Sequence, residues 1–161
     1  MFVLFDLDDT LLMTGEREDR FFGEAFRDVL GRELPTTDWE VLGASTDHGI
    51  LRALGVGDAA IERVADAHEA RWRKALAASP PKPRQGATDA LLRVEGLGMP
   101  TGVATGGFAR VARRKLASLG VSAPPLLATS ESGSTRTALL RHAMRELGPE
   151  GVYVGDGPWD R

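Results

Sequence analysis

The sequence predicts an α/β protein in which a parallel sheet forms the core and a helical segment is inserted after the first strand. Three observations lead to this fold class. The chain opens on a short, continuous apolar run over residues 1–5, which is typical of a strand buried on both faces of a sheet. After residue 80, helical and strand-like patterns alternate, as they do in βαβ units. Between these two parts, residues 14–80 show only helical periodicity.

The inserted segment is predicted to contain three helices. In residues 16–31, Phe22, Phe26 and Val29 recur at helical spacing, and Gly31 is a suitable stop. A second helix is expected around residues 47–54 and a longer one over residues 58–78. One face of the longest helix is marked by Ile61, Val64, Ala65, His68, Trp72, Ala75 and Leu76.

A proline-rich stretch, SPPKPRQG at residues 79–86, cannot continue a helix and is predicted to be a linker. Beyond it, helices and strands are expected in alternation. The predicted helices are 88–97, 108–119 and 135–147, and the predicted strands are 99–104, 125–129 and 152–154. We therefore expect residues 1–13 and 81–161 to form the α/β core and residues 14–80 to form a helical cap.

Composition excludes several classes of site. The 161 residues include no cysteine, so disulfides, thiolate metal sites and a cysteine nucleophile are ruled out. The net charge of −3 does not favour a nucleic-acid partner. No apolar run reaches the roughly 20 residues of a membrane helix, and the first strand leaves no room for a signal segment. We expect a cytoplasmic protein with no membrane or nucleic-acid partner; its oligomeric state stays open.

Acidic residues gather where two of the predicted strands end. Asp6 and Asp8 follow the first strand, and Asp156 and Asp160 follow the last. In open α/β sheets, ligands bind at the carboxyl ends of the strands. Carboxylates converging there suit a hard, oxygen-seeking cation, Mg²⁺ before Ca²⁺ or Zn²⁺. The sequence thus predicts a Mg²⁺ site formed by these acids.

The other strand ends favour a phosphate ligand, because Mg²⁺ usually sits beside a phosphate. Thr105 and Gly106 offer a hydroxyl and backbone N–H groups before a predicted helix, and Arg136 begins another helix with a positive charge. One carboxylate could then attack phosphorus to form an acyl-phosphate. Asp8 could protonate the leaving oxygen and afterwards deprotonate a water molecule.

The motifs FDLDDT, ATGG, the helix-start Arg136 and VGDGPWD together resemble those of the haloacid dehalogenase-like (HAD) hydrolase superfamily. The likeness is to the branch with a helical cap after the first strand, which includes phosphoglycolate phosphatase and β-phosphoglucomutase. The resemblance covers essentially the whole chain. It implies a Rossmann-like core with an inserted α-helical cap domain. The family usually carries lysine where this chain has Arg136, and its members usually continue through another strand and helix beyond the position of Arg161.

The resemblance also implies roles for individual residues. Asp6 would be the nucleophile, and Asp8 would be the general acid/base that also lends its backbone carbonyl to Mg²⁺. Thr105 would bind the phosphoryl group. Asp156 would bind Mg²⁺ directly, with Asp160 in support. The family's dehalogenases lack the second acid, so Asp8 favours phosphoryl transfer.

These observations predict a Mg²⁺-dependent phosphatase that hydrolyses a small phosphorylated metabolite through an aspartyl-phosphate on Asp6. Two alternatives remain open: a phosphomutase of the same superfamily, and a truncated or regulatory, catalytically weak binding protein.

Two further groups of residues are predicted to be structural. The basic segment RVARRKL is expected to be a helix whose solvated face carries Arg110, Arg113, Arg114 and Lys115. The three histidines, His48, His68 and His142, show no metal-ligand spacing.

Overall fold

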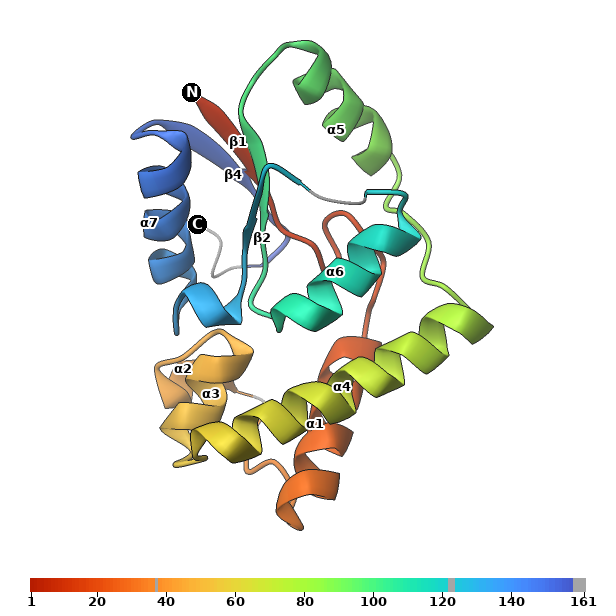
Figure 1. Cartoon of the computed structure of the whole chain (residues 1–161), viewed down its shortest axis with the longest axis vertical. Coiled ribbons are helices and arrows are strands. Elements are labelled where there is room, and N and C mark those ends of the chain that lie inside the picture. Colours follow the sequence, from red (N-terminus) through yellow and green to blue (C-terminus); the bar gives the residue numbers. More distant parts are fainter. Residues whose placement is uncertain (37, 122–123, 158–161) are drawn as a thin grey trace.

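A four-stranded parallel sheet lies at the centre of the computed structural model, which describes residues 1–36, 38–121 and 124–157 (Figure 1). The strand order is β3-β2-β1-β4, so the first strand of the chain lies inside the sheet. The strands are β1 (Phe2–Phe5), β2 (Thr101–Ala104), β3 (Leu126–Ala128) and β4 (Gly151–Val154).

Helices cover both faces of this sheet (Figure 1). Val3 and Phe5 of β1 point to the face covered by α5 (Ala87–Gly96) and α6 (Ala109–Ser118). Phe2 and Leu4 point to the opposite face, where α7 (Arg136–Leu147) packs. This two-sided burial explains why β1 is apolar throughout instead of alternating. The expected α/β fold with a parallel sheet is therefore confirmed.

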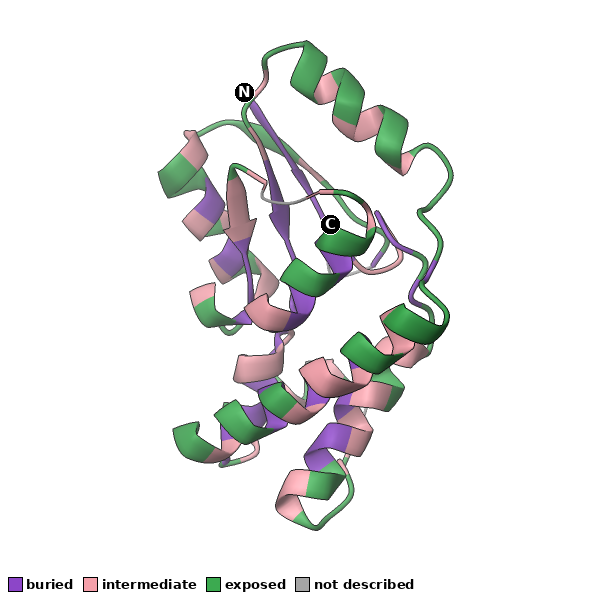
Figure 2. Ribbon diagram, turned by 45° about the vertical axis from the view of Figure 1, so that its right-hand side comes forward, coloured by how far each residue is buried: buried purple, intermediate pink, exposed green. Residues whose placement is uncertain are grey.

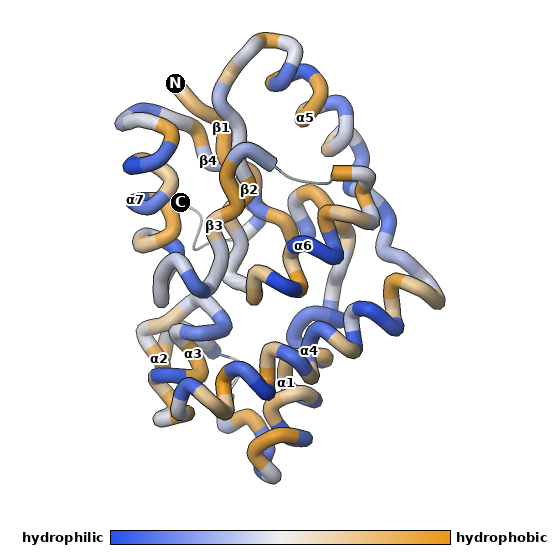
Figure 3. Tube along the Cα trace, in the orientation of Figure 1, coloured by the Kyte–Doolittle hydropathy of each residue, from blue (hydrophilic) through white to orange (hydrophobic). Residues whose placement is uncertain are grey.

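The inserted segment forms a separate group of helices below the sheet in Figure 1. It consists of α1 (Arg17–Leu30), α2 (Trp39–Leu42), α3 (Asp47–Ala53) and α4 (Asp58–Ala78). Apolar and polar stretches alternate along these helices, as amphipathic packing requires (Figure 3). Gly31 ends α1 in the left-handed conformation, with φ 68°, as the sequence suggested.

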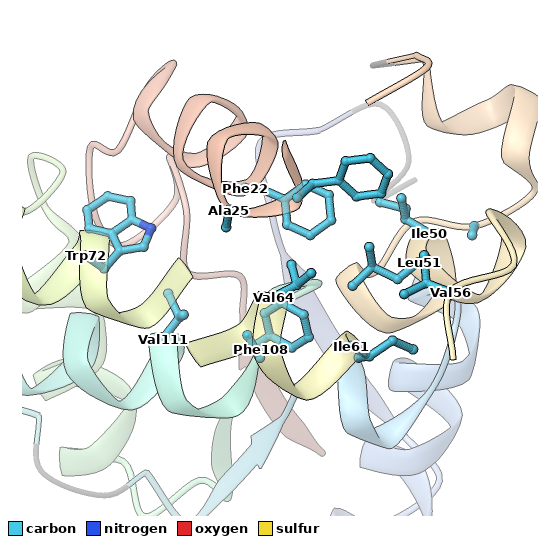
Figure 4. Packing of buried hydrophobic residues seen from close by; sticks show 13 residues of the cluster. Phe22, Ala25, Ile50, Leu51, Val56, Ile61, Val64, Trp72, Phe108 and Val111 are labelled. Carbon is cyan, nitrogen blue, oxygen red and sulfur yellow. The ribbon is translucent and has the colours of Figure 1, made fainter. Parts of the chain in front are cut away.

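The apolar cluster of the inserted helices also takes in part of α6. Phe108, which precedes α6, and Val111 on α6 are fully buried and pack among residues of α1, α3 and α4 (Figure 4). Figure 4 shows Phe108 close to Val64 of α4. Burying this surface stabilises the closed arrangement by roughly 25 cal/mol per Å² of apolar area. The helices therefore share their apolar core with the sheet-bearing part.

The observed elements agree with the predicted ones to within about two residues at each end. The exceptions are α2 and a short 3₁₀ helix, η1 (Ser130–Ser132), neither of which was predicted. Neither carries enough residues for a periodic pattern. Among the helices that the structure describes, none combines the length and apolar character needed to cross a bilayer.

One prediction for α6 is wrong. Lys115 is not on a solvated face: it is 1 % exposed. Arg113 and Arg114 are exposed, whereas Arg110 is half-buried against α4. Figure 2 shows the buried stripe that runs along α6. Lys115 shares that stripe with Val111, one helical turn earlier. The helical spacing of these two residues could therefore have predicted that Lys115 faces inward.

Candidate active site

The carboxyl ends of the strands meet at a cavity of about 410 Å³ that the inserted helices cover. Six of the seven residues predicted to act at the site lie in its wall: Asp6, Asp8, Thr105, Gly106, Arg136 and Asp156. The remaining one, Asp160, falls outside the described residues. The inserted helices and their loops contribute further lining residues, among them Glu18, Asp19, Ser45 and Asp47.

Asp6 is held at the end of β1 by a charged partner. Its side chain is buried, and its Oδ1 accepts a hydrogen bond of 2.7 Å from the backbone N–H of Leu7. Arg136 donates to both carboxylate oxygens, with Nη1 3.3 Å from Oδ1 and Nη2 3.4 Å from Oδ2. Such a two-pronged contact is what a guanidinium, unlike an ammonium, makes with a carboxylate. Arg136 thus holds the Asp6 carboxylate in place in the wall of the cavity.

Gly106 lies where a loop of the inserted segment approaches the core. A Cβ atom at Gly106 would lie 2.7 Å from the carbonyl oxygen of Ser45 and 3.5 Å from Cζ of Arg136. The Gly106 carbonyl accepts a 2.8 Å hydrogen bond from the backbone of Asp47. Glycine is therefore required here by the close approach of two backbones. Next to it, the buried Thr105 hydroxyl accepts from the N–H of Gly107 at 3.2 Å.

The same loop is fastened to the core at two further points. Oγ1 of Thr46 donates to the carbonyl of Gly133 at 2.9 Å, and Oγ of Ser45 accepts from the backbone N–H of Arg136 at 3.0 Å. His48, on α3, also contacts the core through Ser130, with 2.8 Å between Nδ1 and Oγ. The inserted helices are thus in a closed position over the cavity.

Asp8 is paired with the buried Lys115. Nζ of Lys115 lies 2.6 Å from Oδ1 of Asp8 and also donates to Glu18 of α1. The ammonium additionally lies 4.4 Å from the ring centroid of Trp72. Burial raises the pKa of Asp8, an effect that the nearby Lys115 opposes. The two acids raise the pKa of Lys115 in turn, despite its burial.

A second group of titratable side chains lies behind this pair. His68 of α4 is fully buried, with Nε2 3.6 Å from Oε1 of Glu18 and Nδ1 3.8 Å from Oδ2 of Asp47. Burial and then the charge of Glu18 raise the pKa of Asp47 well above its usual range. Burial, followed by the charge of Lys115, lowers the pKa of His68 to about 3. The sequence did not show this grouping, because its members are far apart along the chain.

Asp156 follows β4, the neighbour of β1, and so reaches the same cavity. Oγ1 of Thr10 donates to its Oδ1 at 3.3 Å, which ties the end of β4 to the loop after β1. Asp9 lies in the loop after β1 and has a structural role there. Its backbone is left-handed, with φ 53°, and its carboxylate accepts from the N–H of Gly15, so it supports the loop.

The donor set in this wall is one that a hard cation prefers. Asp6, Asp8 and Asp156 supply carboxylate oxygens to one cavity, and no cysteine competes with them. Oxygen ligands of this kind fit Mg²⁺. The residues present are therefore compatible with the predicted ion.

A comparison with protein-family models assigns the chain. The model described as haloacid dehalogenase-like hydrolase matches residues 1–161. The chain belongs to the haloacid dehalogenase-like hydrolase family. The resemblance seen in the sequence motifs is thereby confirmed, and the protein is classed as a hydrolase.

Solved structures share the fold of this haloacid dehalogenase-like hydrolase. A hydrolase from Pseudomonas syringae matches with a TM-score of 0.74 and 21% identity, over 99% of this chain and 77% of the other. CbbY from Rhodobacter sphaeroides, in complex with phosphate, matches with a TM-score of 0.74 and 22% identity, over 98% and 78%. A predicted phosphoglycolate phosphatase from Haemophilus somnus has a TM-score of 0.65 and 15% identity, over 99% and 78%. No curated protein sequence matches the chain.

Proposed function

We propose that this hydrolase is a phosphatase that cleaves a small phosphorylated metabolite through an aspartyl-phosphate on Asp6. One observation carries the proposal: the buried carboxylate of Asp6 is held by both Nη atoms of Arg136 in the wall of a cavity that Asp8 and Thr105 also line. A carboxylate held in this way is oriented as a nucleophile, and the guanidinium beside it can donate hydrogen bonds to phosphoryl oxygens.

In the first step, an oxygen of Asp6 bonds to phosphorus while the ester P–O bond breaks. Asp8 gives its proton to the leaving oxygen, a role that its burial favours because burial raises its pKa. In the second step, water attacks phosphorus and Asp8 takes up the water proton. The P–O bond to Asp6 breaks, and inorganic phosphate leaves. Arg136 and the hydroxyl of Thr105 would bind the phosphoryl oxygens throughout.

Asp6 and Asp156 would hold Mg²⁺ through their carboxylates and Asp8 through its backbone carbonyl, with Asp160 in support. When bound, Mg²⁺ supplies positive charge that offsets the repulsion between the phosphoryl group and the carboxylates.

The helical segment 14–80 would be the cap, and residues 1–13 and 81–161 the core. The cap would exclude water from the cavity and select the substrate. A cavity of about 410 Å³ suits a small molecule. The structural relative CbbY was solved with phosphate, and a variant of CbbY was solved with xylulose-(1,5)bisphosphate. These complexes support a small phosphorylated substrate for the present chain.

The test is phosphate release from a panel of small phosphate esters, with Mg²⁺ and with a chelator. We expect release to require Mg²⁺ and to fall by at least about a thousandfold in Asp6→Asn, as when an enzyme loses its nucleophile. Asp89→Asn, the same change at an exposed position of α5, is the control and should retain full activity. Equal release by wild type and a folded Asp6→Asn would contradict the proposal. Transfer of phosphate between sugar positions, without net release, would show a phosphomutase instead.

A further inference from the structure

We propose that Glu18, Asp47 and His68 form a binding site for a divalent transition-metal ion within the helical segment 14–80. The site uses none of the residues proposed to hold Mg²⁺ at the strand ends, and it does not depend on the proposed phosphatase activity.

Three different helices bring the ligands together. Glu18 comes from α1, Asp47 from the first residue of α3 and His68 from the middle of α4. One ligand atom from each residue can be chosen so that all three lie within 4.8 Å of one another. A cation with bonds of about 2.0–2.2 Å would need only a small inward movement of these side chains. The arrangement would cross-link α1, α3 and α4.

His68 is the observation that points to a ligand. Its side chain is 0 % exposed, and neither ring nitrogen finds a hydrogen-bond partner among the described residues. A buried polar group left unpaired costs about 1–3 kcal/mol. A cation bound by one ring nitrogen would remove that cost for this nitrogen.

The charges around the cluster are unbalanced. Asp8, Glu18 and Asp47 place three carboxyl groups together, and the described part of the chain sets one ammonium group, that of Lys115, within ion-pair distance of them. Lys115 and Nε1 of Trp72 both donate to Oε2 of Glu18, so Oε1 stays directed toward His68. A divalent cation between Oε1 and His68 would interact favourably with these carboxyl groups.

The cluster is reachable from the cavity. Glu18, Asp47 and Gly107 all lie in the wall of the cavity. At Gly107 a Cβ would lie 3.8 Å from Oε1 of Glu18 and 4.0 Å from Oδ2 of Asp47, so no side chain separates these two oxygens from the backbone of Gly107. An ion could therefore enter without unfolding the helices.

The mixed ligand set distinguishes this site from a magnesium site. One imidazole and two carboxylates favour Zn²⁺, Co²⁺ or Mn²⁺, whereas Mg²⁺ prefers oxygen ligands alone. We take Zn²⁺ as the probe because it has no redox chemistry and binds imidazole well.

The experiment measures Zn²⁺ bound to the full chain after equilibrium dialysis, in excess Mg²⁺ to fill oxygen-only sites. We expect His68→Gln and Asp47→Asn each to lose one bound Zn²⁺ relative to wild type. His142→Gln, in the partly exposed α7 position, is the matched control and should bind as wild type does. Folded variants that bind as much Zn²⁺ as wild type would overturn the proposal.

A second measurement needs no variant of the cluster. The chain has three histidines, so ¹⁵N-histidine NMR can follow each ring, with His48→Gln and His142→Gln used for assignment. We expect Zn²⁺ to shift one ring nitrogen of His68 strongly. An unchanged His68 spectrum at saturating Zn²⁺ would show that the cluster holds protons instead of a metal ion, and would overturn the proposal even if the cluster variants fail to fold.

Discussion

Lys115 is a buried cation whose charge is compensated by two acids from different parts of the chain. Asp8 belongs to the loop after β1, and Glu18 to α1, while the ammonium itself comes from α6. Removing one member of a buried ion pair leaves the other charge uncompensated, which costs far more than the pair contributes. At the residue scale, stability should therefore be sensitive to this contact.

We expect Lys115→Met to lower the free energy of unfolding by about 3 kcal/mol, because the partly buried Asp8 and Glu18 would be left without their cation. Urea unfolding at neutral pH measures this. Arg113→Met, an exposed position on the same helix, should change stability by no more than about 0.5 kcal/mol. A similar small effect in both variants would contradict the pairing.

The buried His68 makes stability depend on pH in a defined direction. Its pKa of about 3 in the folded state lies below the ordinary value of 6.5. Between these values the unfolded chain binds a proton that the folded chain does not, so stability falls as the pH drops. The stability that the neutral His68 contributes is present at pH values above 6.5 and is lost progressively as the pH falls below 6.5.

Between pH 7 and pH 5, we expect wild type to lose about 2 kcal/mol more stability than His68→Gln, measured by urea unfolding with a chelator present. The raised pKa values of Asp8 and Asp47 act in the opposite direction, since a carboxyl that holds its proton longer when folded stabilises at lower pH. Both acids are present in wild type and in His68→Gln. The other charged groups near His68, which are Glu18, Lys115 and Arg71, are also present in both proteins. Their contributions to the pH dependence of stability therefore largely cancel in the comparison. Parallel pH profiles for the two proteins would contradict the assignment.

At the scale of elements, the loop before α3 determines how the inserted helices meet the core. Ser45 and Thr46 are bonded to Arg136 and Gly133, and Gly106 leaves room for the Ser45 carbonyl. The same Arg136 contacts Asp6. A shift of this loop would therefore reach the proposed nucleophile through one side chain.

Gly106→Ala should separate the loop from the core, because the new Cβ would meet the Ser45 carbonyl at 2.7 Å. We expect a loss of about 1–3 kcal/mol in stability, typical of overpacking, together with a lower kcat/KM for the best ester of the panel. Gly23→Ala, inside α1 with no atom within 4 Å of the added Cβ, should instead stabilise the protein by up to about 1 kcal/mol. Unchanged activity and stability in Gly106→Ala would show that the loop is not under this constraint.

At the scale of the whole molecule, α4 and α6 lie along each other, and acidic residues of α4 face basic residues of α6. Arg110 pairs with Glu62 and Asp66, and Arg114 pairs with Glu69. The arginines are partly exposed, so each pair contributes only about 0.2–1 kcal/mol. Together with the apolar contacts of Phe108 and Val111, they hold the inserted helices in the closed position.

We expect the double variant Arg110→Gln, Arg114→Gln to exchange amide hydrogens faster in α4 and α6, while α7 is unchanged. Salt should have the same effect on wild type, since at about 1 M the Debye length is only about 3 Å. Hydrogen exchange followed by mass spectrometry measures both. Exchange in α4 that responds neither to the variant nor to salt would show that apolar packing alone closes the helices.

The elements and the region of the site could be predicted from local patterns. An unbroken apolar run predicts a doubly buried β1, and helical periodicity predicts α1 and α4. The rule that parallel strands present ligand-binding residues at their carboxyl ends then grouped Asp6, Thr105 and Asp156 correctly in one cavity. These features follow from short-range regularities, which the backbone imposes whatever lies further along the chain.

The buried pairing of Lys115 with Asp8 and the meeting of Glu18, Asp47 and His68 depend on something else. Each joins residues of separate elements, and charged residues are by default expected at the surface. Whether a lysine or a histidine is solvated or enclosed depends on which helix packs over it, and that is decided when α1, α3 and α4 close onto α6. Helical spacing could place Lys115 and His68 on inward faces, but only the packed molecule supplies the acids that meet them.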